Sequence, residues 1–148
     1  MSSVSMEQVR ADRLRNLFAT LDIAPFGSLW RVDEAIWKEN IRESYRRDNE
    51  RPNHPGCSLR KYNTTLGPIP ILHGTRSMTR DPRRRRECVA VRDVYGKEDT
   101  TYFGGLDPVF LEYQMWQGGR ITPADKGRLD ADEMNKMQAL CARRGWTL

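Results

Sequence analysis

The chain lacks long apolar runs, and this absence excludes one class of protein at the outset. Its 148 residues contain only short apolar stretches, whereas a transmembrane helix needs about 20 consecutive apolar residues. The first residues, MSSVSMEQVRADRLRN, contain no apolar segment of the kind that a secretory signal requires. We therefore expect a cytoplasmic protein that does not bind a membrane.

Cysteine and histidine are also scarce. The three cysteines are Cys57, Cys88 and Cys141, an odd number at wide spacing, which excludes a disulfide framework and favours a reducing compartment. His54 and Cys57 form one H-x-x-C pair, but no second pair stands at ligand spacing. Because structural zinc takes four ligands, we predict neither a metal site nor a cofactor.

Lysine is rare and arginine replaces it, with 5 Lys against 20 Arg and a net charge of +5. The planar guanidinium of arginine binds phosphate through two hydrogen bonds and stacks on bases, so a nucleic-acid partner is one interpretation. The other is a GC-rich genome, because net charge alone indicates partners only weakly. The length is typical of a single domain.

The N-terminal quarter of the chain predicts a helix, a strand and a charged excursion. Residues 5–20 have helical apolar spacing, with Ser5 at the N-cap. Residues 27–32 alternate apolar and polar side chains, as a half-buried strand does. Residues 33–50 predict a mobile or partly helical excursion between two strands. We expect residues 1–24 to be a helical extension and residues 25–148 to be the main domain.

The middle of the chain predicts short strands broken by glycine and proline. These expected strands are residues 57–62, 69–72, 88–94 and 100–103. Such spacing is typical of a small barrel or sandwich. The sequence after Asp107-Pro108 fits either a strand or a helix.

The last 27 residues predict two helices. The segment Thr122-Pro123-Ala124-Asp125 predicts the start of a short helix. The terminal helix is the clearest element, with a capping box at Asp130 and Glu133 and a left-handed stop at Gly145. We therefore expect an α+β fold, a small β-barrel with an N-terminal and a C-terminal helix.

Four residues around the second and third predicted strands could cleave RNA without a metal. Attack by the 2′-hydroxyl needs a proton acceptor, a proton donor and positive charge at the phosphate. Arg51 can supply the charge, His54 and His73 can move protons, and Thr75 can donate a hydrogen bond. The alternative is structural: a solvated arginine, a turn at His54, a hydrogen-bonded core histidine and a turn-stabilising threonine.

A dense run of arginines follows the third predicted strand. The candidate nucleic-acid-binding residues are Arg76, Arg80, Arg83, Arg84, Arg85 and Arg86. They could hold phosphates, dock an acidic protein segment, or belong to a solvated loop. Trp30, Trp37 and Tyr62 are candidates for stacking on bases.

The order of these features resembles that of the PemK/MazF-like toxins. Gly27-Ser28-Leu29-Trp30-Arg31-Val32 is similar to their G-[DS]-x-[VIL]-W-x-V strand, and Arg51-Pro52 is similar to their step into the second strand. Residues 69–75 match an apolar strand that ends in Thr or Ser. Gly119-Arg120-Ile121-Thr122 is similar to the lead into their terminal helix.

This resemblance implies a fold, an activity and partners. It implies an SH3-like barrel over residues 26–145 and a metal-independent endoribonuclease in which Arg51 stabilises the phosphate and Thr75 is its hydroxyl partner. It also implies a homodimer and a cognate antitoxin that covers the RNA groove. Two alternatives stay open: a non-catalytic module that binds nucleic acid or protein, and a barrel toxin aimed at gyrase, because one fold hosts several functions.

Overall fold

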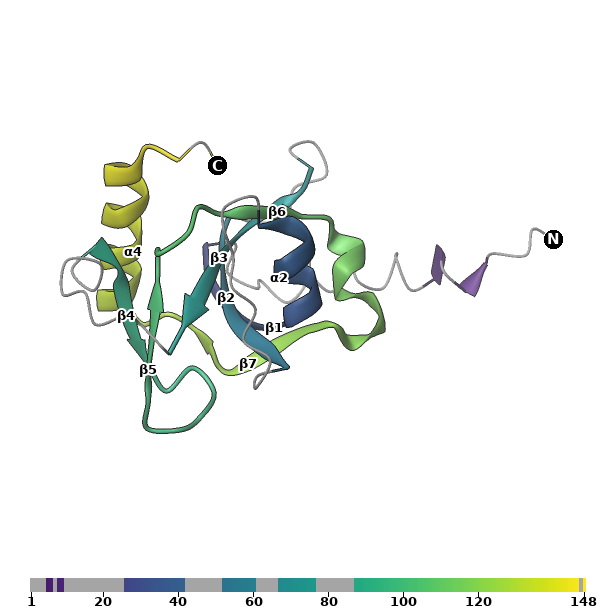
Figure 1. Ribbon diagram of the computed structural model, residues 1–148, viewed down its shortest axis with the longest axis horizontal. Coiled ribbons are helices and arrows are strands. Elements are labelled where there is room, and N and C mark those ends of the chain that lie inside the picture. Colours follow the sequence, from purple (N-terminus) through teal and green to yellow (C-terminus); the bar gives the residue numbers. More distant parts are fainter. Residues whose placement is uncertain are drawn as a thin grey trace.

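The computed structural model describes residues 5, 6, 8, 9, 26–41, 52–60, 67–76, 87–146 and 148 (Figure 1). The predicted site residues Arg51, Arg80, Arg83, Arg84, Arg85 and Arg86 lie outside this part of the chain, as does Tyr62. The strands and helices, in chain order, are β1 (Phe26–Asp33), α2 (Glu34–Asn40), β2 (Asn53–Leu59), β3 (Ile69–Thr75), β4 (Val89–Arg92), β5 (Thr100–Phe103), β6 (Val109–Leu111), the 3₁₀ helix η1 (Tyr113–Gly119), β7 (Ile121–Arg128) and α4 (Ala131–Arg144).

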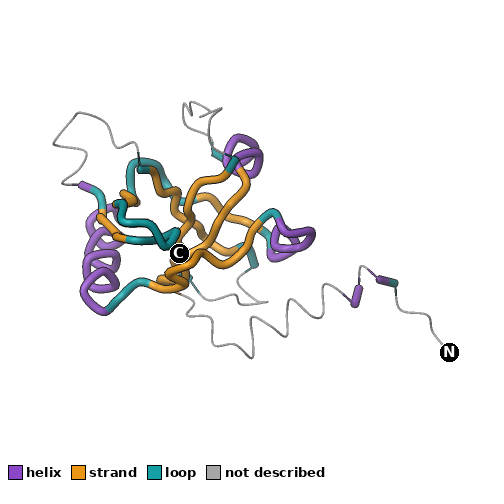
Figure 2. The backbone as a smooth tube through the Cα atoms, turned by 90° about the horizontal axis from the view of Figure 1, so that it is seen from below, coloured by secondary structure: helices purple, strands orange, loops and turns teal. Residues whose placement is uncertain are grey.

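The strands form one curled antiparallel sheet of seven strands. Its order is β4-β5-β3-β2-β1-β7, and β6 pairs with β3 next to β5. The curl brings the two ends of the sheet together, because the amide of Lys126 in β7 donates to the carbonyl of Val94, just beyond β4, at 3.1 Å. Figure 2 shows the strands wrapping around a common centre. The predicted α+β class and barrel-like sheet are confirmed at this level.

Two apolar clusters fill the two sides of the sheet. One lies under α4 and contains Leu29, Leu72, Phe103, Met137 and Leu140. The other lies under α2 and η1, and its members are Trp30, Val32, Ile36, Trp37, Ile69, Ile71, Val109, Leu111, Trp116 and Ile121. Because both faces of β1 meet a cluster, Leu29 and Trp30 are equally buried, and the predicted half-exposed strand is in fact a central one.

The terminal helix α4 forms as its local signals predict. The amide of Glu133 donates to Asp130 Oδ1 at 2.7 Å, and the amide of Asp130 donates to Glu133 Oε1 at 3.0 Å, which completes the capping box. Gly145 ends the helix in the left-handed region at φ 64°. Beyond it, Trp146 Nε1 donates to Asp107 Oδ1 at 3.1 Å, so the tail returns toward the barrel.

The predicted start of β2 was wrong, and of the two ends expected for β3 the later one is correct. β2 begins at Asn53 rather than residue 57, so His54-Pro55-Gly56 is strand rather than a turn. β3 continues to Thr75, as the family resemblance implied, rather than ending at residue 72 as the residue pattern predicted. His54 and His73 are buried by Glu34 and Trp37, which lie far from them in the sequence, so the local sequence pattern does not show that these positions belong to strands. The predicted strand 88–94 is shorter, at Val89–Arg92, and the strand 100–103 is confirmed.

The segment 122–125 was wrongly expected to begin a helix. It lies in β7, where Pro123 pairs with Trp30 and Thr122 with Arg31. The free edge of β1 needs a hydrogen-bonding partner, and this tertiary demand overrides the local helix signal. The segment after Asp107-Pro108 contains both alternatives in turn, strand β6 and then the 3₁₀ helix η1.

The other predicted helices are described in part. The amide of Gln8 donates to Ser5 Oγ at 3.1 Å, which confirms the N-cap, while most of the helix expected over residues 5–20 lies outside the described residues. α2 confirms the helical part of the 33–50 excursion. Within the described part of the chain, no helix has both the length and the apolarity to span a membrane.

Candidate functional site

The pairing of β2 with β3 brings four candidate residues to one end of the sheet. The two strands are antiparallel, with Gly56 opposite His73 and Cys57 opposite Leu72. The start of β2 and the end of β3 therefore lie at the same end. The rings of His54 and His73 meet there with centroids 5.0 Å apart and planes tilted by 34°. Thr75 and Arg76 continue this end beyond the histidines.

Glu34 binds the first of these histidines. Asp33 caps α2 by accepting from the amide of Ala35 at 3.0 Å, and the amide of Glu34 donates to the carbonyl of Pro52 at 3.0 Å. These bonds turn the Glu34 side chain inward, where Oε2 lies 2.5 Å from His54 Nδ1. This contact is a buried hydrogen bond between the imidazole nitrogen and the carboxyl group.

The Glu34–His54 pair is almost closed to solvent. Its side chains are 4% and 6% exposed, respectively. Trp37 Nε1 donates to the carbonyl of His54 at 3.3 Å, which closes the pair from the α2 side. In such surroundings each partner depends on the other, because removing either one leaves a buried polar group without its hydrogen bond.

His73 is buried as a neutral ring. It lies edge-on to Trp37 at 4.9 Å, with an interplanar angle of 81°. Burial, and next the positive charge of His54, lower the pKa of His73 from 6.5 to about 3. His73 is therefore uncharged at neutral pH in this conformation, with a proton on only one of its two ring nitrogens.

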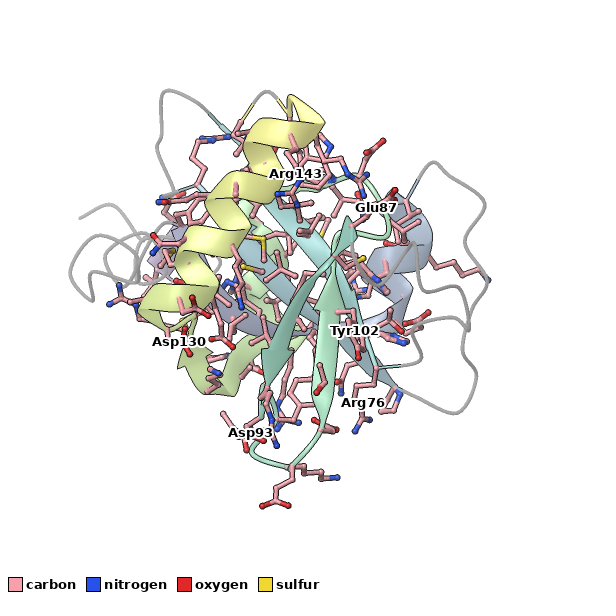
Figure 3. The ribbon with its side chains drawn as sticks, turned by 90° about the vertical axis from the view of Figure 1, so that its left-hand side faces the viewer. Arg76, Glu87, Asp93, Tyr102, Asp130 and Arg143 are labelled. Atoms are coloured by element: carbon pink, nitrogen blue, oxygen red, sulfur yellow. The ribbon has the colours of Figure 1, made fainter. Side chains whose placement is uncertain are left out.

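Thr75 and Arg76 are the half-buried part of this end of the sheet. Arg76 Nη1 binds Asp99 Oδ2 at 2.6 Å, and Asp99 comes from the turn between β4 and β5. Thr75 pairs with Tyr102 of β5, and Figure 3 shows Arg76 and Tyr102 on the same side of the molecule. Thr75 and Arg76 are more accessible to an incoming macromolecule than the two buried histidines.

A glycine makes the close approach of β3 and β5 possible. A Cβ added at Gly74 would lie 2.6 Å from Phe103 Cε1 and 2.7 Å from Thr101 Cγ2. Real side chains do not tolerate such contacts without a shift of their neighbours. Gly74 therefore allows β3 to pack closely against β5 at the point where His73 precedes it and Thr75 follows it in the sequence.

The structure separates the predicted site residues into three groups. His54 and His73 are in contact, and Thr75 and Arg76 follow at the end of β3, whereas Arg51 and the remaining arginines of the run lie outside the described residues. Trp30 is 4% exposed. Its ring packs edge-on against Trp116, at a centroid distance of 5.6 Å. A base could stack on Trp30 only after the core opened.

Sequence reasoning missed Glu34 and Asp99. Glu34 lies 20 residues before its partner, inside a segment with several other acids, so no local pattern distinguishes it. Asp99 lies in a polar turn of ordinary composition. In the part of the chain that the structure covers, no three His, Cys, Asp or Glu side chains are grouped so that they could hold a metal ion.

Comparison with known proteins identified no protein similar to this chain. No family model matches the chain, and neither a curated protein nor a solved structure is significantly similar to it. Together with Glu34 of α2, the residues at the start of β2 and the end of β3 supply a buried acid–imidazole pair, a neutral imidazole, a hydroxyl and a guanidinium. These groups can bind a phosphate and move a proton.

Proposed function

We propose that the chain is a toxin-like, metal-independent endoribonuclease on an SH3-like barrel, similar to the PemK/MazF-like toxins. The observation that supports the proposal is the antiparallel pairing of β2 and β3, which gathers His54, His73, Thr75 and Arg76 at one end of the sheet. Arg51 precedes β2 by two positions in the sequence. In this proposal it joins the same end of the sheet.

The reaction requires no group beyond these side chains and the RNA. The 2′-oxygen attacks the adjacent phosphorus and loses its proton to a base, while the bond from phosphorus to the 5′-oxygen breaks. The leaving 5′-oxygen takes up a proton, so the products are a 2′,3′-cyclic phosphate and a 5′-hydroxyl. The guanidinium groups of Arg51 and Arg76 stabilise the charge of the pentacoordinate phosphate, and Thr75 donates to one of its oxygens.

The buried histidines act from behind the phosphate-binding groups. Glu34 holds a proton on His54, and neutral His73 lies next to it as an acceptor. Because both rings are nearly closed to solvent, the start of β2 has to move from β3 before either exchanges a proton with RNA. We therefore expect slow turnover, because this conformational step limits the rate. Mutations that weaken the pairing between the start of β2 and β3 should raise the turnover rate.

The proposal is tested with purified protein, a structured RNA and EDTA. We expect cleavage products whose new 5′-hydroxyl ends are phosphorylated directly by a polynucleotide kinase, and whose 2′,3′-cyclic phosphate ends cannot be ligated until the phosphate is removed. Arg51→Ala should lower the rate on the order of 10²-fold, and Thr75→Val about tenfold, since it removes one hydrogen bond. Intact RNA under all conditions, with normal growth of cells that express the protein, contradicts the proposal.

A matched control separates this site from general loss of positive charge. Arg143 is an exposed arginine of α4, and Figure 3 shows it at the far end of the molecule from Arg76. Arg143→Ala should leave the cleavage rate within about twofold, whereas Arg76→Ala should lower it. Equal losses in the two variants would mean that net charge, rather than this end of the sheet, supports binding.

The proposal includes two protein partners, a second copy of the chain and an antitoxin. An acidic antitoxin segment would neutralise the arginines of residues 76–86 and exclude RNA from them. Light scattering tests the homodimer, and a small acidic protein encoded in the neighbouring reading frame, which restores growth and abolishes cleavage, tests the antitoxin. A monomer that cleaves RNA would contradict the dimer while leaving the activity intact.

Burial favours a second candidate function, a non-catalytic module that binds nucleic acid or an acidic protein. His54 and His73 are 5% and 8% exposed, as structural residues are. In this case Arg51→Ala leaves binding nearly unchanged. Neutralising Arg83, Arg84, Arg85 and Arg86 together weakens binding severely, and the binding that is left depends less steeply on salt.

A further inference from the structure

A second surface lies where the C-terminal end of α2 faces β6. A pocket of about 600 Å³ opens there, lined by Glu39, Asn40, Ile41, Asp107, Pro108, Val109 and Phe110. Figure 1 shows α2 and β6 next to each other. We propose that this pocket binds an arginine or lysine side chain that an extended segment of a partner protein presents.

The lining has the two kinds of group that such a side chain needs. Glu39 and Asp107 contribute carboxylates, and no Lys or Arg is among the lining residues that the structure describes. In a chain of net charge +5, this is a local excess of negative charge. An anionic ligand such as RNA is repelled there, and a cation is attracted.

Phe110 supplies the apolar contact. Its side chain is 49% exposed, although its strand neighbours Val109 and Leu111 are buried. The other large apolar side chains that are exposed in the described residues, Met6 and Leu148, lie near the chain ends. An aromatic ring beside carboxylates suits arginine and lysine, because their methylene stems pack on it and their charged groups are attracted to its face.

The walls of the pocket are held in place by their own bonds. Trp146 Nε1 donates to Asp107 Oδ1 at 3.1 Å. Asn40 Nδ2 donates to the carbonyl of Ile36 at 2.8 Å, and the amide of Ile41 donates to the carbonyl of Trp37 at 2.9 Å. Because these groups are ordered before binding, a ligand loses less of its binding free energy to ordering them.

The pairing of β6 explains why we expect the partner segment to be extended. β6 pairs with β3, from Ile69 opposite Leu111 to Ile71 opposite Val109, and no second partner of β6 occurs among the described strands. An extended peptide can add to such an edge through main-chain hydrogen bonds while one side chain enters the adjoining pocket. A second copy of the chain and RNA are the competing occupants.

The test uses the full chain and the peptide acetyl-Val-Arg-Val-amide as probe. Two matched peptides replace its arginine with citrulline, which keeps the shape without the charge, or with glutamate. We expect saturable binding of the arginine peptide by NMR titration, with amide shifts confined to residues 39–41 and 107–111, and binding at least about tenfold weaker for both matched peptides.

Protein variants locate the binding. Phe110→Ala should weaken binding of the arginine peptide about tenfold, because the apolar contact is lost. Glu39→Gln should weaken it about two- to fivefold, as expected for an exposed charge pair. Glu98→Gln, an exposed acid in the β4–β5 turn, is the matched control and should change nothing. Unaltered amide spectra elsewhere confirm that each variant is folded.

Several results overturn the proposal. These are equal binding of the citrulline peptide, shifts located away from the pocket, and no saturation of the arginine peptide below about 10 mM. A dimer that Phe110→Ala converts to a monomer identifies a second copy as the occupant instead. RNA cleavage does not enter the test, so failure of the proposed activity leaves this result unaffected.

Discussion

Breaking the buried pair of Glu34 and His54 should destabilise the fold, and Glu34→Gln measures by how much. The two side chains are 4% and 6% exposed, and Oε2 lies 2.5 Å from Nδ1. Glutamine keeps the size of the side chain but removes its charge. Since a hydrogen bond to a charged group contributes about 1.5–3 kcal/mol, we expect a loss of that size in the free energy of unfolding. For a chain of this length it lowers Tm by about 3–12 °C.

The assay is chemical denaturation of a double-mutant cycle that combines Glu34→Gln with His54→Asn. Groups in direct contact should couple by at least about 1 kcal/mol, so the double variant loses less stability than the sum of the two single variants. Glu39→Gln, in the same helix but exposed, is the control and should stay within about 0.5 kcal/mol of the original protein. Losses that add within about 0.3 kcal/mol would refute the coupling of this pair.

Three further measurements test the packing and the protonation of the core. Gly74→Ala should destabilise the fold by about 1–3 kcal/mol in denaturation experiments, because its Cβ would lie 2.6 Å from Phe103 Cε1; an unchanged stability would contradict this packing. Burial lowers the pKa of His73 from 6.5 to about 3, so the unfolded chain protonates first. The free energy of unfolding that the neutral ring contributes is therefore complete above about pH 6.5 and declines as the pH falls toward 3, by up to about 1.4 kcal/mol per pH unit. His73→Gln should show a shallower decline of stability with falling pH. If the stability of the variant and of the original protein declines in parallel, His73 is not the cause of the pH dependence. Burial raises the pKa of the Cys57 thiol, so Cys57 should resist alkylation in the native protein while half-buried Cys88 reacts, which peptide mapping can check; early labelling of Cys57 would show that the core opens.

Local signals in the sequence predict α4 correctly, because its cap residues and its stop glycine act within a few positions of the helix. The strand limits were harder to predict. His54 and His73 look like turn residues by type, and they extend β2 and β3 only because Glu34 and Trp37 cover them from another segment. In β7 the proline near the start indicated a helix, but pairing with β1 decided the structure.

The candidate site could be predicted only in part for the same reason. The grouping of His54, His73 and Thr75 follows once two neighbouring strands are assumed to be antiparallel, since this places the start of one beside the end of the other. The acid that binds His54 could not be predicted. It depends on the inward turn of α2, which is fixed by a bond between the amide of Glu34 and the carbonyl of Pro52.

The position of β7 in the sheet has a consequence for synthesis on the ribosome. β1 is an internal strand only because β7, some 90 residues later in the chain, covers its second edge, with Trp30 opposite Pro123. Until residues 121–128 leave the exit tunnel, a nascent chain presents an apolar strand edge without a cover. Folding of the barrel is therefore delayed until β7 has been synthesised, and fragments truncated before β7 should aggregate.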